Sequence, residues 1–160
     1  MAVDMFLKID GVEGEASDHK HGKEIDVLSW SWGMTQSASM ASGTGGGSGK
    51  TDVQDVSITK LIDSSTPALM QHCCSGKHFE KALLTVRKAG QHPVEYMKLE
   101  MHHVIISSLT GGAGKGDDRV TEHITLNFAK FKMTYTPQKD DGSPGPERPL
   151  AFDIRRNELV

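Results

Sequence analysis

The sequence predicts a mainly β protein: a small β-barrel of two packed sheets with one short flanking α-helix, in a single domain spanning residues 1–160. Three observations predict this class. Apolar residues recur at every second position in several segments, which is the spacing of a strand with one buried face. In the segment 120–136 this alternation changes parity midway, as happens where a strand passes between two packed sheets. The segment 66–76 carries the start and stop signals of a helix.

Four short apolar segments are predicted to be strands because their apolar residues alternate and turn-forming or charged residues bound them. They are Val3 to Ile9, Val53 to Leu61, Ala82 to Lys88 and Leu150 to Ile154. The charged loop 13–24 joins the first of them to a further strand at 25–32. In that strand we expect Leu28, Trp30 and Trp32 on one face and Ser29 and Ser31 on the other.

Two long strands are predicted in the second half of the chain. In the segment 94–109 one face is expected to carry Met97, Leu99, Met101, His103 and Ile105, and the other Lys98, Glu100 and His102. In the segment 120–136, Ile124, Leu126 and Phe128 share one parity, and Ala129, Phe131, Met133 and Tyr135 share the opposite one. A bulge or a change of sheet would produce that reversal.

The single predicted helix begins at Thr66, which can serve as the N-cap, with Pro67 at the first helical position. Gly76 suits the left-handed residue that follows a helix C-terminus. Between these signals, Leu69, Met70 and Cys73 form a narrow apolar stripe that could lie on a sheet or close the end of a barrel.

Three connections are rich in glycine or proline: residues 41–50, 110–118 and 137–149. The first holds five glycines in ten residues. Such a composition has no means of ordering itself, so we expect this loop to be mobile or held by a partner.

The composition limits what the chain can do. Only 36% of the residues are hydrophobic and 17 are glycine, which is little apolar material for a self-sufficient monomer. The net charge of −3 gives no overall positive field for nucleic acid. No apolar run approaches the length of a membrane span, so we expect no membrane insertion. Charge appears too early in residues 1–8 for a signal peptide, which predicts synthesis in the cytoplasm.

Two motifs could carry catalysis, and each lacks a requirement. Gly49-Lys50-Thr51 resembles the end of a phosphate-binding loop, but that loop needs glycine where Thr44 stands and a helix after it. The adjacent Cys73 and Cys74 are expected to be reduced thiols near a helix C-terminus, where the dipole does not favour a thiolate. His72 and His78 lie nearby, but no third catalytic group can be identified. We therefore expect no catalysis and no cofactor.

The eight histidines raise the question of a metal site. His102 and His103 are neighbours on a strand and point to opposite faces. His19 and His21 share a parity but have no cysteine or third histidine close by, and a convergence of His123 with a strand histidine stays open. Because the ligand spacing of a metal site is absent, we expect none.

Across nearly its whole length the chain resembles the haemolysin-coregulated protein (Hcp) family of bacterial type VI secretion. The matching segments, in order, are Ala2 to Ile9, Gly14 to Asp18, Glu24 to Gly33, Gln54 to Val56, Asp63 to Pro67, Ser75 to Phe79, Leu84 to Gly90, Val94 to Tyr96, Asp118 to Glu122, Leu126 to Ala129 and Pro137 to Lys139. No single segment is specific, but their combination is.

The resemblance implies a subunit of the type VI inner tube, which forms homohexameric rings with a wide channel. The rings stack, a contracting sheath expels them behind a valine-glycine-repeat spike, and small effector proteins travel inside and are protected there. On this reading the protein leaves the cell through the type VI apparatus. The residues Ser42, Gly43, Thr44, Gly45, Gly46, Gly47, Ser48, Gly49 and Lys50 would form the loop that contacts the adjacent ring.

Strand parity adds an expectation of its own: Ser29 and Ser31 face the lumen and its effectors, because Trp30 and Trp32 take the core side. Two other functions stay open. Trp30 and Trp32 could form an aromatic platform in a carbohydrate-binding β-barrel. A small hydrolase would use a cysteine or the loop ending in Gly49-Lys50-Thr51.

Overall fold

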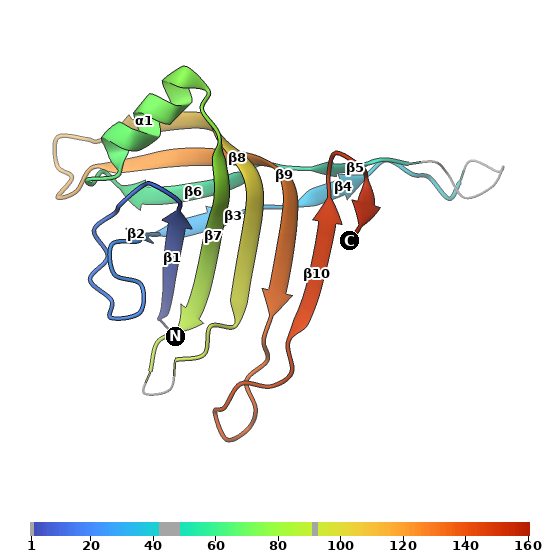
Figure 1. Ribbon diagram of the computed structural model, residues 1–160. Helices are drawn as coiled ribbons and strands as arrows, with labels where there is room; N and C mark the ends of the chain where they lie inside the picture. The colour runs from blue at the N-terminus through green and yellow to red at the C-terminus, as the bar shows by residue number, and fades with distance from the viewer. Residues whose placement is uncertain (1, 42–48, 91–92) are drawn as a thin grey trace.

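The computed structural model describes residues 2–41, 49–90 and 93–160, and over them the chain is built of strands and one helix (Figure 1). The elements are β1 (Val3–Ile9), β2 (Ile25–Asp26), β3 (Ser29–Ser31), β4 (Met34–Gln36), β5 (Thr51–Val53), β6 (Val56–Leu61), α1 (Thr66–Ser75), β7 (Phe79–Lys88), β8 (Met97–Gly112), β9 (Thr121–Tyr135), β10 (Arg148–Asp153) and β11 (Glu158–Leu159). The predicted mainly β class with packed sheets and one helix is confirmed.

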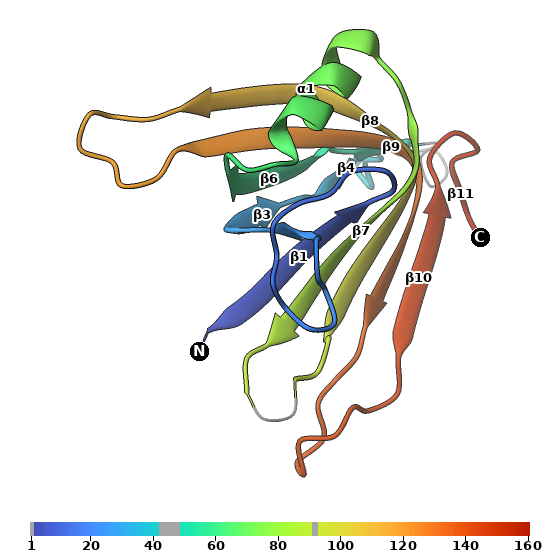
Figure 2. The same ribbon diagram turned by 60° about the vertical axis from the view of Figure 1, so that its left-hand side comes forward.

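The strands form two layers that share β8 and β9. The main path runs β11-β10-β9-β8-β7-β1-β2, and β9 also pairs with β6, which pairs with β3. Every pairing between these strands is antiparallel. In Figure 2, β8 and β9 bend so that one part of each lies beside β7 and β10 and the other beside β6. Apolar residues from both layers fill the space between them.

The sheet is not closed into a barrel among the described residues, which refines the predicted architecture. The segment 25–31 lies where closure would occur: its first part, β2, pairs with β1, and its second part, β3, pairs with β6. Ile25 and Val27 are buried, whereas Leu28 is 47% exposed. The expectation that Leu28 shares the core side with the two tryptophans is therefore wrong, because the segment changes partner strand between β2 and β3.

The predicted parity change in β9 is confirmed. Ile124, Leu126 and Phe128 are buried on one parity and Phe131 on the other. The expected face of β8 holds only as far as Met101. Beyond it Val104 and Ile106 are buried, while His103 is exposed and has φ 55. The expectation that His103 shares the buried face is thus wrong. The buried parity of β8 reverses after Met101, opposite the point where the buried parity of β9 reverses.

Helix α1 ends as the sequence predicts, but it starts differently. Gly76 has φ 68 and its N–H donates to the carbonyl of His72 at 2.9 Å. The N-cap is Ser65, not Thr66. The hydroxyl of Thr66 instead donates to Glu122 Oε1 at 2.7 Å, and it accepts the N–H of Asp63 at 3.1 Å. Leu69 is fully buried and Met70 is 47% exposed, so the apolar stripe is narrower than predicted.

A buried ion pair joins β6, β9 and the start of α1. The side chains of Lys60 and Glu122 are both fully buried and form an ion pair through Nζ and Oε1. Lys60 Nζ also donates to the carbonyl of Leu61 at 2.9 Å and lies 3.1 Å from Asp63 Oδ1. Glu122 Oε2 is buried with no hydrogen-bond partner among the described residues. Lys60 is therefore the main compensation for a buried carboxylate.

Candidate functional site

The layer formed by β3, β6, β9 and the C-terminal part of β8 turns small polar side chains away from the core. Directly paired residues of neighbouring strands share a face. Two rows of such residues cross all four strands: Ser29, Thr59, His123 and Thr110 in one, and Ser31, Ser57, Thr125 and Ser108 in the other. We call these eight residues the hydroxyl face. Ser29 and Ser31 are exposed, and the structure brings both together on it.

Hydrogen bonds fix the margin of the hydroxyl face. Ser107 donates to Asp55 Oδ2 at 2.6 Å, and Asn127 donates to Asp55 Oδ1 at 2.8 Å. The hydroxyl of Thr125 lies 2.6 Å from those of Ser107 and Ser108. Sequence reasoning missed Asp55, Ser107, Thr125 and Asn127 as site residues. They come from separate segments, and only the strand register places them together.

The arrangement can offer hydroxyl donors and acceptors but little charge. Within the two rows His123 is the single ionisable side chain, and its Nδ1 lies 2.9 Å from Thr59 Oγ1. Small polar groups of this kind can make weak, reversible hydrogen bonds to another protein, because each exchanges with water at little net gain.

The two tryptophans lie on the opposite side of the segment and pack against the core. The Trp32 ring meets Phe131 edge-on, with centroids 4.8 Å apart, and its Nε1 donates to the carbonyl of Gln54 at 2.8 Å. Both indoles are partly buried. This agrees with the expectation that Trp30 and Trp32 take the core side. Rings packed in this way do not present the open aromatic platform that a sugar-binding site needs.

The glycine-rich segment is carried by a two-stranded arm, β4 paired with β5. Figure 1 shows this arm leading away from the main sheet. Gly49 and Lys50 lie at the outer end of the paired strands, where Lys50 N–H donates to Ser37 Oγ at 3.0 Å. Lys50 leads into strand β5, so the helix that a phosphate-binding loop requires is absent from this position. The other predicted stacking residues, Ser42, Gly43, Thr44, Gly45, Gly46, Gly47 and Ser48, lie outside the described residues.

The cysteine and histidine candidates do not assemble into a reactive site. Cys73 is half-buried and Cys74 exposed, and both are free thiols. The His72 ring stacks on Phe79 with centroids 4.2 Å apart, and its Nδ1 donates to the carbonyl of Ala68 at 2.7 Å. This imidazole is therefore already engaged. Within residues 2–41, 49–90 and 93–160 no group of three or more His, Cys, Asp or Glu side chains could hold a metal ion.

Hydrogen bonds and ion pairs between charged groups hold loop 13–24 against the outer side of β1 and β7. Arg87 donates to Asp18 at 2.5 and 3.1 Å and to Asp4 at 3.2 Å. The buried His21 ring stacks on Phe6 at 4.5 Å, and its nitrogens lie 2.8 Å from Glu24 and 2.7 Å from Glu95. At Gly14 an added Cβ would come within 2.5 Å of the Glu24 carbonyl oxygen, so the close approach of the loop's two sides requires glycine.

These contacts set carboxylate pKa values. The hydrogen bond from Arg87 holds the pKa of Asp18 well below its usual range. Burial acts to raise the pKa of Glu95, but hydrogen bonds from His21 and Lys98 outweigh it and lower that pKa.

The lowered pKa of Asp18 predicts that its contact with Arg87 contributes less to the stability of the fold in acid. A carboxylate with a depressed folded pKa stabilises the fold fully above its ordinary pKa of about 4, and that contribution is lost as the pH falls below it. We expect Asp18→Asn to lower the urea unfolding midpoint at neutral pH. In this variant the midpoint should also fall less steeply as the pH is lowered from about 5 to about 2. Asp140→Asn, in an exposed loop, is the matched control. Equal acid profiles for Asp18→Asn and the unsubstituted chain would contradict this role.

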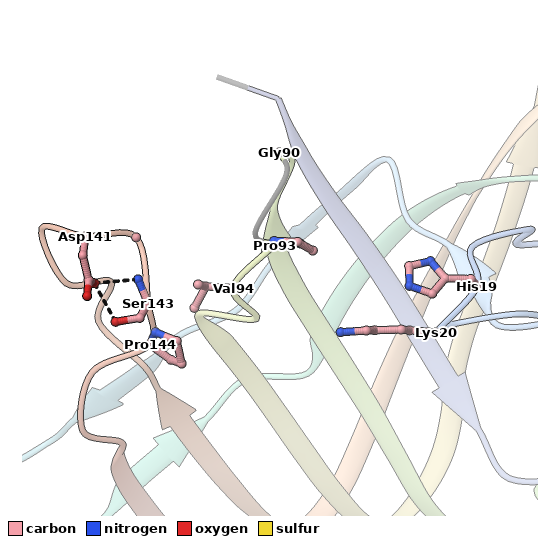
Figure 3. Close-up of a pocket in the computed structure, with 9 residues that line it drawn as sticks. His19, Lys20, Gly90, Pro93, Val94, Asp141, Ser143 and Pro144 are labelled. Atoms are coloured by element: carbon pink, nitrogen blue, oxygen red, sulfur yellow. Dashed lines mark hydrogen bonds between the residues drawn. The ribbon is translucent and has the colours of Figure 1, made fainter.

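An open hollow of about 700 Å³ lies between three loops (Figure 3). Its lining includes His19 and Lys20 on one side and Asp141, Ser143 and Pro144 on the other. Asp141 accepts the N–H of Ser143 at 2.9 Å and its hydroxyl at 2.6 Å, and these hydrogen bonds lower the pKa of the carboxyl. The carboxylate thus serves the loop itself, and these lining residues contain no paired nucleophile and base.

Comparison with known proteins gives one consistent result. The family model described as "Type VI secretion system effector, Hcp" matches residues 6–135. Protein hcp1 of Pseudomonas aeruginosa is 54% identical over 160 residues, covering 98% of both chains. The structure of Hcp1 from Salmonella typhimurium has a TM-score of 0.83 at 34% identity, with complete coverage of both chains.

Two further solved structures are similar. One described as a type six secretion system protein has a TM-score of 0.93 at 30% identity and covers 99% of this chain and 100% of its own. A type VI secretion system effector from Yersinia pestis has a TM-score of 0.78 at 32% identity and covers 94% of this chain and 100% of its own. In addition, none of the described helical residues form a segment long and apolar enough to cross a membrane.

Proposed function

The chain belongs to the Hcp family of type VI secretion proteins, and on that premise we propose that it is a structural subunit of the type VI inner tube, acting by assembly and not by catalysis. Six copies form a ring, and rings stack into a tube. The observation that carries the proposal is the hydroxyl face: four paired strands present a continuous polar surface on the side opposite the core. Such a face suits the wall of a water-filled channel.

Ring closure needs two different surfaces on each subunit, because each copy contacts its neighbours head to tail. Apolar side chains are exposed on two sides of the molecule. Tyr135, Leu150 and Leu159, near the β10–β11 edge, are 46%, 49% and 71% exposed. At the α1 side Ile62, Met70 and Val120 are 45–47% exposed. Contact between these two sets in neighbouring copies would bury apolar surface and stabilise a ring.

In the ring the hydroxyl face lines the lumen, where Ser29 and Ser31 contact small effector proteins. The ring carries and protects these effectors, and the stacked tube is enclosed by a contractile sheath and tipped by a valine-glycine-repeat spike. Expulsion of the tube delivers both tube and cargo out of the cell. Weak hydrogen bonds to a polar wall would let cargo leave, whereas an apolar wall would retain it.

A bulky group on the hydroxyl face tests the carrier role. We expect Ser29→Tyr/Ser31→Tyr to leave the rings intact and to reduce co-purification of an effector with the ring about tenfold, because two phenol rings displace cargo from the wall. Ser17→Tyr, in the exposed loop 13–24, is the control and should have no effect. Undiminished effector recovery with the double variant would remove the hydroxyl face from the cargo site.

The arm formed by β4 and β5 is proposed to contact the adjacent ring through residues 42–50. Deleting residues 45–48 should leave hexamers intact and weaken stacking, because the two strands that flank them in the sequence, β4 and β5, contribute no fully buried residue to the core. Sedimentation of stacked tubes against single rings measures this. Dissolution of the hexamer by the deletion would show that the loop belongs to the ring contact instead.

A further inference from the structure

A second hollow, of about 330 Å³, lies where β8 and β9 pass from one layer to the other. His103 and Ala129 both line it, and the register of the two strands sets them opposite each other at the point where the buried parity reverses. The N–H of Ile154 donates to the carbonyl of Ala129 at 2.9 Å, which brings the turn between β10 and β11 to the same place (Figure 2). We call this hollow, enclosed by β8, β9 and the segments around His78 and Arg155, the corner pocket.

Among the described residues, every ionisable side chain that lines the corner pocket is basic. These side chains are His78, His103 and Arg155, and they come from three separate segments of the chain. All three are exposed, and none makes a hydrogen bond or ion pair through its side chain with another described residue. A guanidinium is always protonated, and an imidazole has at least one N–H donor in either tautomer. The pocket therefore offers several unused donors, one of them fully charged, to an anionic group.

The carboxylates on the adjoining segments do not occupy these donors. Asp55 is engaged by the hydrogen bonds at the margin of the hydroxyl face. Asp153 accepts the N–H of Arg156 at 3.1 Å, and Glu158 lies 3.6 Å from the Arg156 guanidinium. Glu80 stands across from the β8 imidazole in the strand register, but it does not line the pocket and forms no ion pair with a described residue. The Arg155 charge is thus left for a carboxylate from another molecule.

The rest of the lining favours a peptide over a phosphate group or a lipid. Ile105 and Ile154 are half-buried and give the pocket an apolar part, which suits an aliphatic side chain but not a phosphate. Asn127 donates to Asp55 at 2.8 Å, and its Oδ1 has no hydrogen-bond partner among the described residues. This oxygen can accept a backbone N–H, a group that a peptide has and a fatty acyl chain lacks.

The corner pocket continues directly from the hydroxyl face. Asn127 lies two positions after Thr125 on β9, and two positions along a strand return to the same face. Asn127 also pairs with Ile105 of β8, so both lining residues stand one row beyond the row that contains Thr125 and Ser108. A chain segment that contacts the hydroxyl face can therefore reach the corner pocket without leaving the surface of the sheet.

We propose that the corner pocket anchors a peptide segment of the cargo protein in which an aspartate or glutamate lies beside an aliphatic residue. Arg155 holds the carboxylate by charge-assisted hydrogen bonds, the imidazoles of His78 and His103 add donors, and the aliphatic side chain covers Ile105. The inference rests on the proposed function and deepens it. The hydroxyl face gives weak contacts to any polar surface, whereas the corner pocket selects cargo that carries such a segment.

The test measures fluorescence polarisation of a labelled hexapeptide of alternating leucine and aspartate bound to the full chain. An analogue with asparagine in place of aspartate is the uncharged probe, and inorganic phosphate is a competitor. Arg155→Gln should weaken binding of the aspartate peptide about tenfold. Ala129→Leu fills the pocket without a change of charge and should weaken it as much. Arg156→Gln is the matched control, because it removes the same charge from the neighbouring residue outside the lining, and it should change binding less than about twofold.

Four results would overturn the proposal. Equal losses in Arg155→Gln and Arg156→Gln would mean a non-specific charge effect. Equal binding of the asparagine peptide would mean that no carboxylate is recognised. Displacement of the labelled peptide by less phosphate than unlabelled peptide would mean a phosphate site. Loss of rings in Arg155→Gln, with the fold retained by circular dichroism, would mean that a second copy of the chain covers the pocket.

Failure of the pocket and failure of the proposed function are distinguishable, because the peptide measurement does not require a ring. If the unsubstituted chain discriminates between the two peptides but forms no rings, the tube proposal is contradicted and the corner pocket stands as a peptide site. If rings form and Arg155→Gln binds the aspartate peptide unchanged, the pocket assignment alone is wrong.

Discussion

Replacing Lys60 by methionine is expected to lower the free energy of unfolding by about 3–5 kcal/mol, because it leaves Glu122 buried without its cation. Glu122 Oε2 already lacks a partner among the described residues, so the remaining hydrogen bond from Thr66 cannot compensate. Urea unfolding at one fixed protein concentration measures the effect, since assembly would make the midpoint depend on concentration.

The double variant Lys60→Met/Glu122→Leu separates two explanations. If the uncompensated carboxylate is the cause, removing both charges should restore most of the lost stability, as apolar replacements of buried ion pairs often do. If the double variant is as unstable as Lys60→Met alone, the loss comes from the shape of the side chain at position 60 and not from the charge on Glu122. The double-variant result therefore decides whether the pair acts by charge or by shape.

Phe131→Ala is expected to cost about 3–5 kcal/mol of stability. Phe131 is 2% exposed and lies where β9 changes its buried face, in contact with the rings of Trp32, Phe128 and Phe152. Removing it opens a cavity at the junction of both layers. Phe131→Leu keeps most of the volume and should cost less than about 1.5 kcal/mol. Similar losses in the two variants, measured by urea unfolding, would contradict a packing role.

Much of the fold could be predicted because the signals were local. The reversal at Phe128 to Phe131 and the helix stop at Gly76 are visible in short stretches of sequence, and the structure has both. The face of β8 beyond Met101 was predicted wrongly because Val104 and Ile106 are as apolar as Ile105. Alternation alone cannot choose between two apolar parities. The left-handed backbone at His103 decides it.

Most of the site could not be predicted, because its residues lie far apart in the sequence and meet only when the strands pair. Ser29 and Ser31 could be assigned to the polar side because tryptophans alternate with them. Their neighbours Thr59, Thr125 and Asn127 join them only through strand pairing across long separations. Lys60 did leave a signal: it shares its parity with the apolar Val56 and Ile58, and Glu122 shares its parity with Ile124 and Leu126. Opposite charges at two apolar-parity positions predict a buried pair.

The sparse apolar composition acquires a structural meaning in this account. The molecule has a continuous buried core, yet it leaves apolar side chains exposed on two separate sides and presents the hydroxyl face on the outside of one layer. A subunit that contacts neighbours on its flanks and cargo on its hydroxyl face would have this distribution.

Native mass measurement combined with negative-stain imaging at micromolar concentration tests the central claim most directly. The account predicts a species of six chains, about 104 kDa from a subunit of 17.4 kDa, that images as a ring with an open channel. A monodisperse monomer with no rings at that concentration would contradict it.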